Sequence, residues 1–426
     1  MRMTLNNQMQ GRSLAAGVPS SALAFRVWAW QGENLFEPVF PRLAVQRNTS
    51  CRRKGYGSNK FSPHQARKLR TRNPESSGWS LLRVDARPTL PDASSRSSLG
   101  FLEFWVPMNL ELLGIHHVTA VTARARDNLA FYTKTLGMRL VKKTVNQDDV
   151  RAYHLFYADA KGSPGTDLTF FDWSHATKQR FGNHSVSRVG LRVASAESLR
   201  HWVALFAQEK VVHSGIVERD HREIFDFQDP EGLRLRLVHD DKSGEGNPWD
   251  YSPIPARFQI RGLGPVTITV PDLAPTDGVL TEVMRMRRVR EYPDPDAPQY
   301  TVHVFEMGPG GAGAELHLQV RPDLPPVEPG AGGVHHVAFR VPNIDEHRAW
   351  VKQLDKFGLP NSGEIDRFYF RSLYFREPNQ VLFELATDGP GFATDEDPAH
   401  LGEHLALPPF LESRRAAIEV NLEPLS

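Results

Sequence analysis

One pattern occurs four times between residues 112 and 390: a short alternating strand, an amphipathic helix and three further strands. The first strands of the four copies read LLGIHHVTAV, SVSRVGLRV, GLGPVTITV and GGVHHVAFRV. A unit of roughly 55–75 residues with one apolar face cannot bury that face alone, so the copies must pack against one another. The pattern predicts an α+β fold of four βαβββ modules, arranged as two tandem domains at residues 110–245 and 255–390.

The helix of the first copy shows how the elements are delimited. Asp127 is a candidate N-cap, Phe131 and Leu136 belong to an apolar stripe at helical spacing, and Gly137 predicts a left-handed end. The last strands of two copies follow the similar turns DPEG and EPNQ. Beyond them, residues 391–426 read as an apolar anchor and a short helix. We expect this tail to cover the mouth of the fold or to form a subunit contact.

Residues 1–107 differ in composition from the rest of the chain. They hold 16 Lys and Arg against 6 Asp and Glu, are rich in Ser and show no sustained periodicity. The favoured interpretation is an upstream extension, with Met108 as the natural start. A disordered tail with a role of its own and an organelle transit peptide are the two alternatives.

Composition excludes several classes of function. The formal net charge is +1 and the body of the chain has no basic stripe, which argues against nucleic-acid binding. No apolar run approaches the roughly 18 residues that a membrane-spanning helix needs. Cys51 is the only cysteine, so no disulfide framework or thiolate metal site is expected, and a cytoplasmic location is predicted.

Adjacent histidines distinguish the outer two copies from the inner two. The pairs are His116–His117 and His335–His336, and the matching positions hold Ser187–Arg188 and Gly264–Pro265. Glu384 lies in the last strand of the fourth copy, and the alignment places Phe170, Arg236 and His317 at its counterparts. Ligand-type residues thus occur together in copies one and four, which predicts one shared site and modules one and four close in space.

Two histidines and one carboxylate form the facial triad of non-haem Fe(II) oxygenases, which leaves coordination positions open for substrate and dioxygen. A carboxylate in the apolar strand VLFELA is costly in a core unless it is paired or binds a metal. The alternative is that each His–His pair is a strand end with hydrogen-bonded imidazoles.

Several longer stretches carry a family resemblance over about residues 110–390: LGIHHVTAVT, YHLFYAD, GSPGTDLTFF, GGVHHVAFRV and EIDRFYFRSLYFREPNQVLFELATD. In these the chain resembles the vicinal-oxygen-chelate superfamily, and within it the ring-cleaving dioxygenases that open hydroquinones. The resemblance implies curved mixed sheets around a metal and an Fe(II) centre in which Mn(II) can substitute. It also implies an aromatic diol and O2 as substrates, and the metal ligands His117, His336 and Glu384.

The same resemblance implies a set of residues around the bound substrate: His116, His335, Thr119, Arg367 and Tyr374. Arg367 is expected to hold a phenolate or developing oxyanion, and Tyr374 to orient a hydroxyl or donate a proton. His116 or His335 is expected to act as a base. The alternatives are a surface salt bridge for Arg367 and a packed strand aromatic for Tyr374. Asp366 and His154 are further polar candidates outside the predicted set.

Two other functions remain open, together with the oligomeric state, for which a homo-oligomer is one option. A glyoxalase-type isomerase or lyase would need a fourth protein ligand at the position aligned with Phe170. A binding protein that sequesters small molecules would need no metal. Neither the ring substituents nor the choice between hydroquinone and catechol can be predicted from these residues.

Overall fold

The computed structural model describes residues 110–240 and 246–425, so the predictions for residues 1–107 lie outside the described residues. Each of the four modules has the predicted order of elements. In the first module these are β1 (Ile115–Thr122), α1 (Ala125–Ala130), η1 (Phe131–Thr135), β2 (Arg139–Val145), β3 (Tyr153–Ala158) and β4 (Asp167–Asp172). In the second they are β5 (Ser185–Val193), α2 (Ala196–Glu209), β6 (Val217–Arg219), β7 (Arg222–Gln228) and β8 (Arg234–His239).

The third and fourth modules repeat the arrangement. The third holds β9 (Leu263–Val270), α3 (Leu273–Gly278), η3 (Val279–Val283), β10 (Arg287–Pro293), β11 (Thr301–Glu306) and β12 (Glu315–Val320). The fourth holds β13 (Val334–Val341), α4 (Ile344–Lys356), β14 (Ile365–Asp366), β15 (Arg371–Arg376) and β16 (Leu382–Thr387). Short helical turns lie outside the modules: η2 (Ala256–Phe258), η4 (Ala312–Ala314), η5 (Phe392–Thr394), α5 (Pro409–Glu412) and α6 (Arg415–Glu419).

The first helix begins earlier than predicted. It starts at Ala125 after Arg124, whose side chain makes no capping hydrogen bond, so Asp127 lies within the first turn and is not the N-cap. The helix then widens into the π-helical turn η1, and Gly137 adopts the predicted left-handed conformation with φ 67°.

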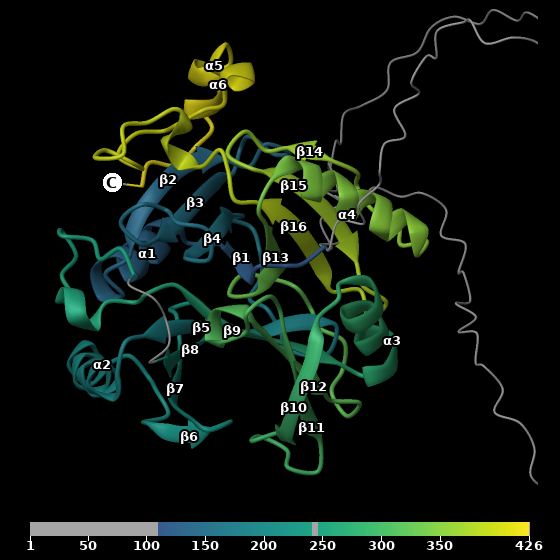
Figure 1. Ribbon diagram of the computed structural model, residues 1–426. Coiled ribbons are helices and arrows are strands. Elements are labelled where there is room, and N and C mark those ends of the chain that lie inside the picture. The colour runs from purple at the N-terminus through teal and green to yellow at the C-terminus, as the bar shows by residue number, and fades with distance from the viewer. Residues whose placement is uncertain (1–109, 241–245, 426) are drawn as a thin grey trace, which may run out of the picture. The chain divides into compact units, whose positions relative to one another are not determined.

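The modules pair across the sequence in two eight-stranded mixed sheets. The first sheet has the order β14-β15-β16-β13-β1-β4-β3-β2 and joins modules four and one. The second has the order β10-β11-β12-β9-β5-β8-β7-β6 and joins modules three and two (Figure 1). The ranges 110–245 and 255–390 therefore divide the sequence but not the sheets. Each sheet combines one module from each range, because β1 pairs antiparallel with β13 and β5 pairs antiparallel with β9. Each of these pairings joins the free edges of the two first strands at the centre of a sheet.

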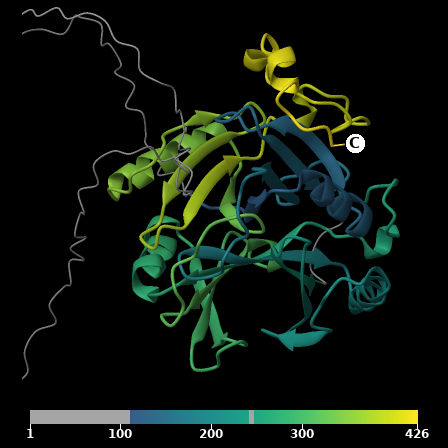
Figure 2. The ribbon, with the colours of Figure 1, turned by 180° about the vertical axis from the view of Figure 1, so that it is seen from behind.

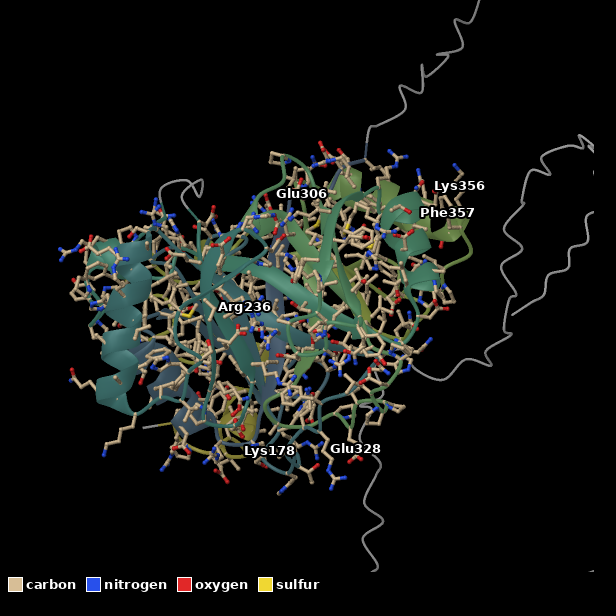
Figure 3. All side chains as sticks on the ribbon, turned by 90° about the horizontal axis from the view of Figure 1, so that it is seen from below. Lys178, Arg236, Glu306, Glu328, Lys356 and Phe357 are labelled. Carbon is tan, nitrogen blue, oxygen red and sulfur yellow. The ribbon has the colours of Figure 1, made fainter. Side chains whose placement is uncertain are left out.

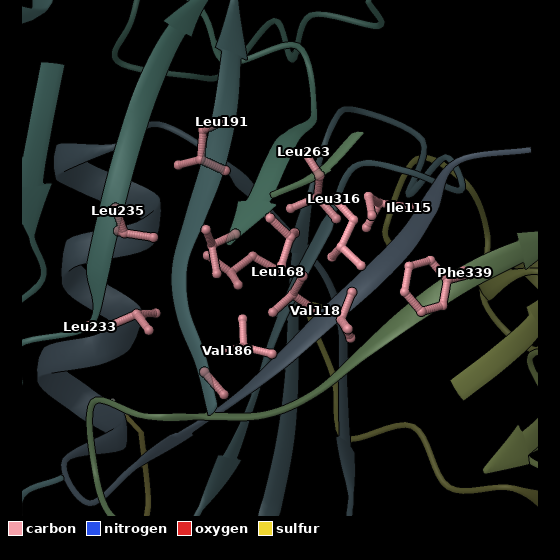
Figure 4. Packing of buried hydrophobic residues seen from close by; sticks show 14 of the residues in the cluster. Ile115, Val118, Leu168, Val186, Leu191, Leu233, Leu235, Leu263, Leu316 and Phe339 are labelled. Carbon is pink, nitrogen blue, oxygen red and sulfur yellow. The ribbon is translucent and has the colours of Figure 1, made fainter. Parts of the chain in front are cut away.

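One continuous hydrophobic core connects the two sheets. Figure 4 shows Val118 and Phe339 of the first sheet near Leu263 and Leu316 of the second. Among the longer helices, α4 lies against the first sheet beside β15 and β16, and α2 against the second beside β7 and β8 (Figures 1 and 2). Within the described residues, no helix has the length and apolar character needed to cross a membrane.

The C-terminal tail runs beside the edge strand β2. Leu405 forms a parallel bridge with Lys143, and the Ala406 amide donates to the Lys143 carbonyl oxygen at 2.9 Å. The guanidinium of Arg139 donates to the carbonyl oxygens of Pro398 and Ala399, both at 3.0 Å. The tail thus occupies one open edge of the sheet that carries the histidine pairs.

Candidate metal centre

Three potential ligand atoms converge at the middle of the first sheet. The Nε2 atoms of His117 and His336 lie 3.2 Å apart, and Glu384 Oε2 lies 3.2 Å and 2.9 Å from them, respectively. The strand register explains this convergence, because β13 lies between β1 and β16 and thus brings His336 between the other two residues. All three side chains are buried, and Glu384 has no exposed surface.

This arrangement fits a divalent metal. Three ligands that each lie about 2.1 Å from a metal and at right angles to one another are themselves about 3.0 Å apart. Both carboxylate oxygens of Glu384 are buried and accept no hydrogen bond of ordinary geometry. A buried carboxylate facing two imidazole nitrogens without such bonds needs a cation to offset its desolvation. The donor set of two imidazoles and one carboxylate suits Fe(II) and Mn(II).

His116 fixes the ring of its neighbour through a short chain of hydrogen bonds. His116 Nδ1 lies 2.9 Å from His117 Nδ1, and His116 Nε2 lies 3.1 Å from the carbonyl oxygen of Thr387. Burial, together with neighbouring His117, lowers the pKa of His116 to about 3, so its imidazole is neutral. A neutral His116 that donates from Nε2 to Thr387 must accept at Nδ1. This requires a proton on His117 Nδ1 and leaves the lone pair of His117 Nε2 for the metal.

His335 repeats this relation in the fourth module. Its Nδ1 lies 2.8 Å from His336 Nδ1, and burial followed by the charge of His336 holds its pKa well below the ordinary value. The ring also packs against Phe171 and Trp173, with centroid distances of 5.5 and 5.7 Å. Neither His116 nor His335 lines the adjacent cavity.

That cavity opens beside His117 and His336 and measures about 450 Å³ including its mouth. Apart from His117 and His336, its walls combine aromatic rings with polar side chains from modules one and four. These residues are Thr144, Val145, Asn146, Gln147, Asp148, His154, Phe156, Phe171, Arg367, Tyr369, Phe370 and Tyr374. Concave, largely aromatic walls with a few converging polar groups are typical of a small-molecule site.

Arg367 and Tyr374 both line this cavity. The guanidinium of Arg367 lies 5.5 Å from the centroid of the Tyr374 ring and pairs with both oxygens of Asp148, at 3.2 and 2.8 Å. Tyr374 is paired directly with Glu384 across β15 and β16. Burial, with the charge of Glu384, raises the pKa of Tyr374 above its ordinary value, so its hydroxyl stays protonated.

Thr119 does not line the cavity but is connected to it. Its Oγ1 lies 2.8 Å from Thr169 Oγ1, which lies 2.9 Å from His154 Nε2. Burial, with the charges of His117 and His336, holds the pKa of His154 well below its ordinary value. His154 lines the cavity although it was outside the predicted set, and its position on β3, facing β4, could have indicated this. Asp366 is exposed, accepts from the Phe368 amide and does not line the cavity.

The register corrects the predicted counterpart of Glu384 in the first module. Glu384 pairs with Ala338, two residues after His336 of β13. The residue two positions after His117 is Thr119, which pairs with Thr169 and not with Phe170. Phe170 is fully buried and belongs to the hydrophobic core. A glyoxalase-type site would have a fourth ligand at this position, and a threonine hydroxyl already hydrogen-bonded to its neighbours is a poor one.

The second sheet carries different chemistry at the matching places. His317 is the counterpart of Glu384 in the third module, and it clusters with Glu315 and Asp220. Arg222 donates to both oxygens of Glu315, at 2.6 and 2.8 Å, and Arg290 donates to both oxygens of Asp220. Because guanidinium groups already neutralise these carboxylates, the cluster is unsuited to a metal.

Comparison with known proteins identifies the class. The family model described as the Glyoxalase/Bleomycin resistance protein/Dioxygenase superfamily matches residues 114–237 and 262–385, and the chain belongs to this family. A Bacillus subtilis protein named "Putative ring-cleaving dioxygenase MhqA" is 49% identical over 74% of this chain and 100% of its own length. The chlorohydroquinone/hydroquinone 1,2-dioxygenase of Sphingobium indicum is 31% identical over 70% of this chain and 92% of its own.

A solved structure agrees with the fold. A Bacillus subtilis protein described as a "putative dioxygenase" superposes with a TM-score of 0.69 at 33% identity, over 74% of this chain and 98% of its own. The predicted fold of tandem vicinal-oxygen-chelate domains built from βαβββ modules is thus confirmed.

Proposed function

We propose that this chain is an Fe(II)-dependent ring-cleaving dioxygenase of hydroquinone-type aromatic diols. The observation that carries the proposal is the convergence of His117, His336 and Glu384 beside a cavity with aromatic walls. The names of the relatives, which include a hydroquinone dioxygenase, support the same class of substrate.

The three ligands would hold the metal at the inner end of the cavity, where it would bring a deprotonated substrate hydroxyl and O2 together. The remaining walls bind and orient the ring. Phe171 and Phe370 offer apolar faces to an aromatic substrate, and Arg367 offers charge-assisted hydrogen bonds to a phenolate oxygen. Tyr374, which stays protonated, can donate a hydrogen bond to the same end of the substrate.

The chemistry of a para-diol restricts the bond that breaks. In a hydroquinone the two hydroxyl-bearing carbons are opposite each other, so no ring bond joins them. Cleavage must therefore occur between one hydroxyl-bearing carbon and its neighbour, which corresponds to extradiol-type regiochemistry. Both oxygen atoms of O2 enter the opened product, and no external reductant is consumed.

We assign His116 and His335 the role of positioning residues and not of bases, because neither lines the cavity. Replacement of His116 by alanine is expected to weaken metal affinity about 10- to 100-fold, since His117 loses the acceptor that fixes its tautomer. The measurement is Fe(II) or Mn(II) affinity by competition with a chelator. His201→Ala is a suitable control, because that histidine lies on α2 beside the second sheet. Equal affinity of His116→Ala and wild type would refute the role.

The function is tested by oxygen uptake with protein loaded anaerobically with Fe(II). A panel of hydroquinones and catechols should show turnover with at least one hydroquinone and stoichiometric consumption of O2. Loading with Mn(II) in parallel tests which metal supports activity. Failure to bind either metal would favour the alternative of a small-molecule binding protein. Metal binding without O2 uptake from any hydroquinone would contradict the proposed substrate class.

A further inference from the structure

The second sheet contains arginines where the first sheet contains metal ligands. Arg188 follows Ser187 at the position that matches His336, and Arg236 matches Glu384, because Gly190 pairs with Arg236 as Ala338 pairs with Glu384. Figure 3 shows Arg236 over the strands of the second sheet. The β5–β9 half of the fold thus has a counterpart of the metal site with the opposite charge.

These guanidinium groups share too few carboxylates. Asp226 Oδ1 accepts from Arg236 Nε at 2.6 Å, while Arg188 Nε lies 3.5 Å from the same oxygen. Arg219 Nη1 lies 3.5 Å from the other oxygen, Asp226 Oδ2. Burial and the neighbouring charge of Arg236 lower the pKa of Arg188 to about 10, which is the response of an incompletely neutralised cation. One carboxylate therefore serves three cations.

A pocket lies beside this cluster and is lined by one of its cations, Arg188, together with a further arginine, Arg234. It measures about 360 Å³ including its mouth and is lined by Phe181, Gly182, Ser187, Arg188, Arg234, Thr269, Asp296, Gln319, Arg321 and Leu324. Arg188 Nε is buried and has no hydrogen-bond acceptor among the described residues. The guanidinium of Arg234 stacks on the Phe181 ring at 3.8 Å from its centroid.

The other charged groups of the pocket do not neutralise the surplus positive charge of Arg188 and Arg234. Arg321 is already bound to Asp323 and Asp294. Asp296 raises the pKa of both Arg188 and Arg234 through its charge, yet burial lowers the pKa of each arginine overall. The hydroxyl of Ser187 and the amide of Gln319 lie on the same wall, so the pocket holds polar groups as well as charge.

We propose that this pocket binds a small anion through a carboxylate or phosphate group held by Arg188 and Arg234. Planar guanidinium groups match both oxoanions in charge and geometry, and a guanidinium with a buried N–H that donates no hydrogen bond is stabilised by such a partner. The site lies on the sheet opposite to the metal centre and is formed by modules two and three. Anion binding therefore does not depend on metal loading or on the proposed dioxygenase function.

Isothermal titration calorimetry of the full chain with inorganic phosphate and with succinate tests the proposal and separates the two classes of anion. Wild type is expected to bind at least one of them. Arg234→Gln and Arg188→Gln should each weaken that binding about tenfold or more. The matched control is Arg257→Gln, which removes a guanidinium stacked on Phe258 at 4.4 Å outside the pocket and should leave affinity unchanged.

Two further measurements separate a loss of anion binding from a loss of the metal site and from misfolding. His336→Ala, which removes a metal ligand, should bind the anion as wild type does, so failure of the dioxygenase proposal would not affect this one. Thermal melting checks that the more exposed Arg234→Gln variant is folded. No heat with either anion up to about 10 mM, or equal affinities of the folded Arg234→Gln variant and wild type, would overturn the proposal.

Discussion

Replacing Glu384 by alanine is expected to abolish tight metal binding and the O2 uptake that depends on it. The change removes the only anionic group among the three proposed ligands, and the loss of metal affinity should exceed the 10- to 100-fold effect typical of an outer partner. Metal should also stop protecting the fold. A metal at about a thousand times its dissociation constant adds about 4 kcal/mol to the free energy of unfolding of wild type, and the variant should gain none.

The matched control for this variant is Glu377→Gln. Glu377 is likewise a fully buried carboxylate of the fourth module, but it accepts from the Asn379 and Val381 amides and contacts Thr276. Its loss should reduce stability and leave the affinity for metal unchanged. Chelator competition measures affinity, and melting with and without metal measures protection. A Glu384→Ala protein that retains wild-type affinity would show that the metal, if any, binds elsewhere.

The candidate metal ligands could be identified in the sequence because they break the pattern of the strands that hold them. His–His pairs in two of four matching strands, and one glutamate in an apolar strand, are conspicuous in the sequence. Their convergence supports the prediction that modules one and four are close in space. Pairing of those modules within one sheet could not be predicted, because tandem repeats do not show which copy supplies the neighbouring strand.

Two predicted positions, the counterpart of Glu384 in the first module and the start of the first helix, were wrong by one to a few residues, because the local sequence there is compatible with more than one assignment. In the first module, the first four residues of strand β4 are buried on both faces, so the pattern of the strand could not distinguish Thr169 from Phe170 as the counterpart of Glu384. The start of the first helix was misplaced because Asp127 is a good capping residue, although the helix begins before it. The wall formed by Arg367 and Asp148 joins loops more than 200 positions apart, which no local pattern reveals.

A buried lysine on β2 links the C-terminal tail to the cavity. Lys142 has no exposed surface, and its Nζ lies 2.7 Å from Asp395 Oδ1, in contact with Glu396, and 3.0 Å from the Phe392 carbonyl oxygen. The ammonium also lies 4.6 Å from the ring centroid of Tyr369, whose hydroxyl donates to Asp395 at 2.9 Å. Because Tyr369 lines the cavity, the tail and the cavity wall share one charged cluster.

Replacing Lys142 by methionine is expected to lower the free energy of unfolding by about 3 kcal/mol. Methionine keeps the apolar stem but leaves two largely buried carboxylates without their cation, and breaking a buried ion pair at one partner typically costs about 3–5 kcal/mol. Because Asp395 and Glu396 are partly exposed, we expect a loss of stability at the lower end of this range. Urea unfolding followed by tryptophan fluorescence measures the change.

Lys143→Met isolates the contribution of the buried cluster. Lys143 is the next residue on the same strand, but its ammonium donates to the exposed Glu403 carbonyl oxygen, so its loss should cost less than about 1 kcal/mol.

If the cluster holds the tail, Lys142→Met should also make residues 391–425 more sensitive to proteolysis before global unfolding, and Lys143→Met should not. Equal stabilities of the two variants would mean that solvent compensates Asp395 and Glu396. The tail would then be held by its backbone bridge to β2 and by Arg139, and the wall of the cavity at Tyr369 would not depend on Lys142.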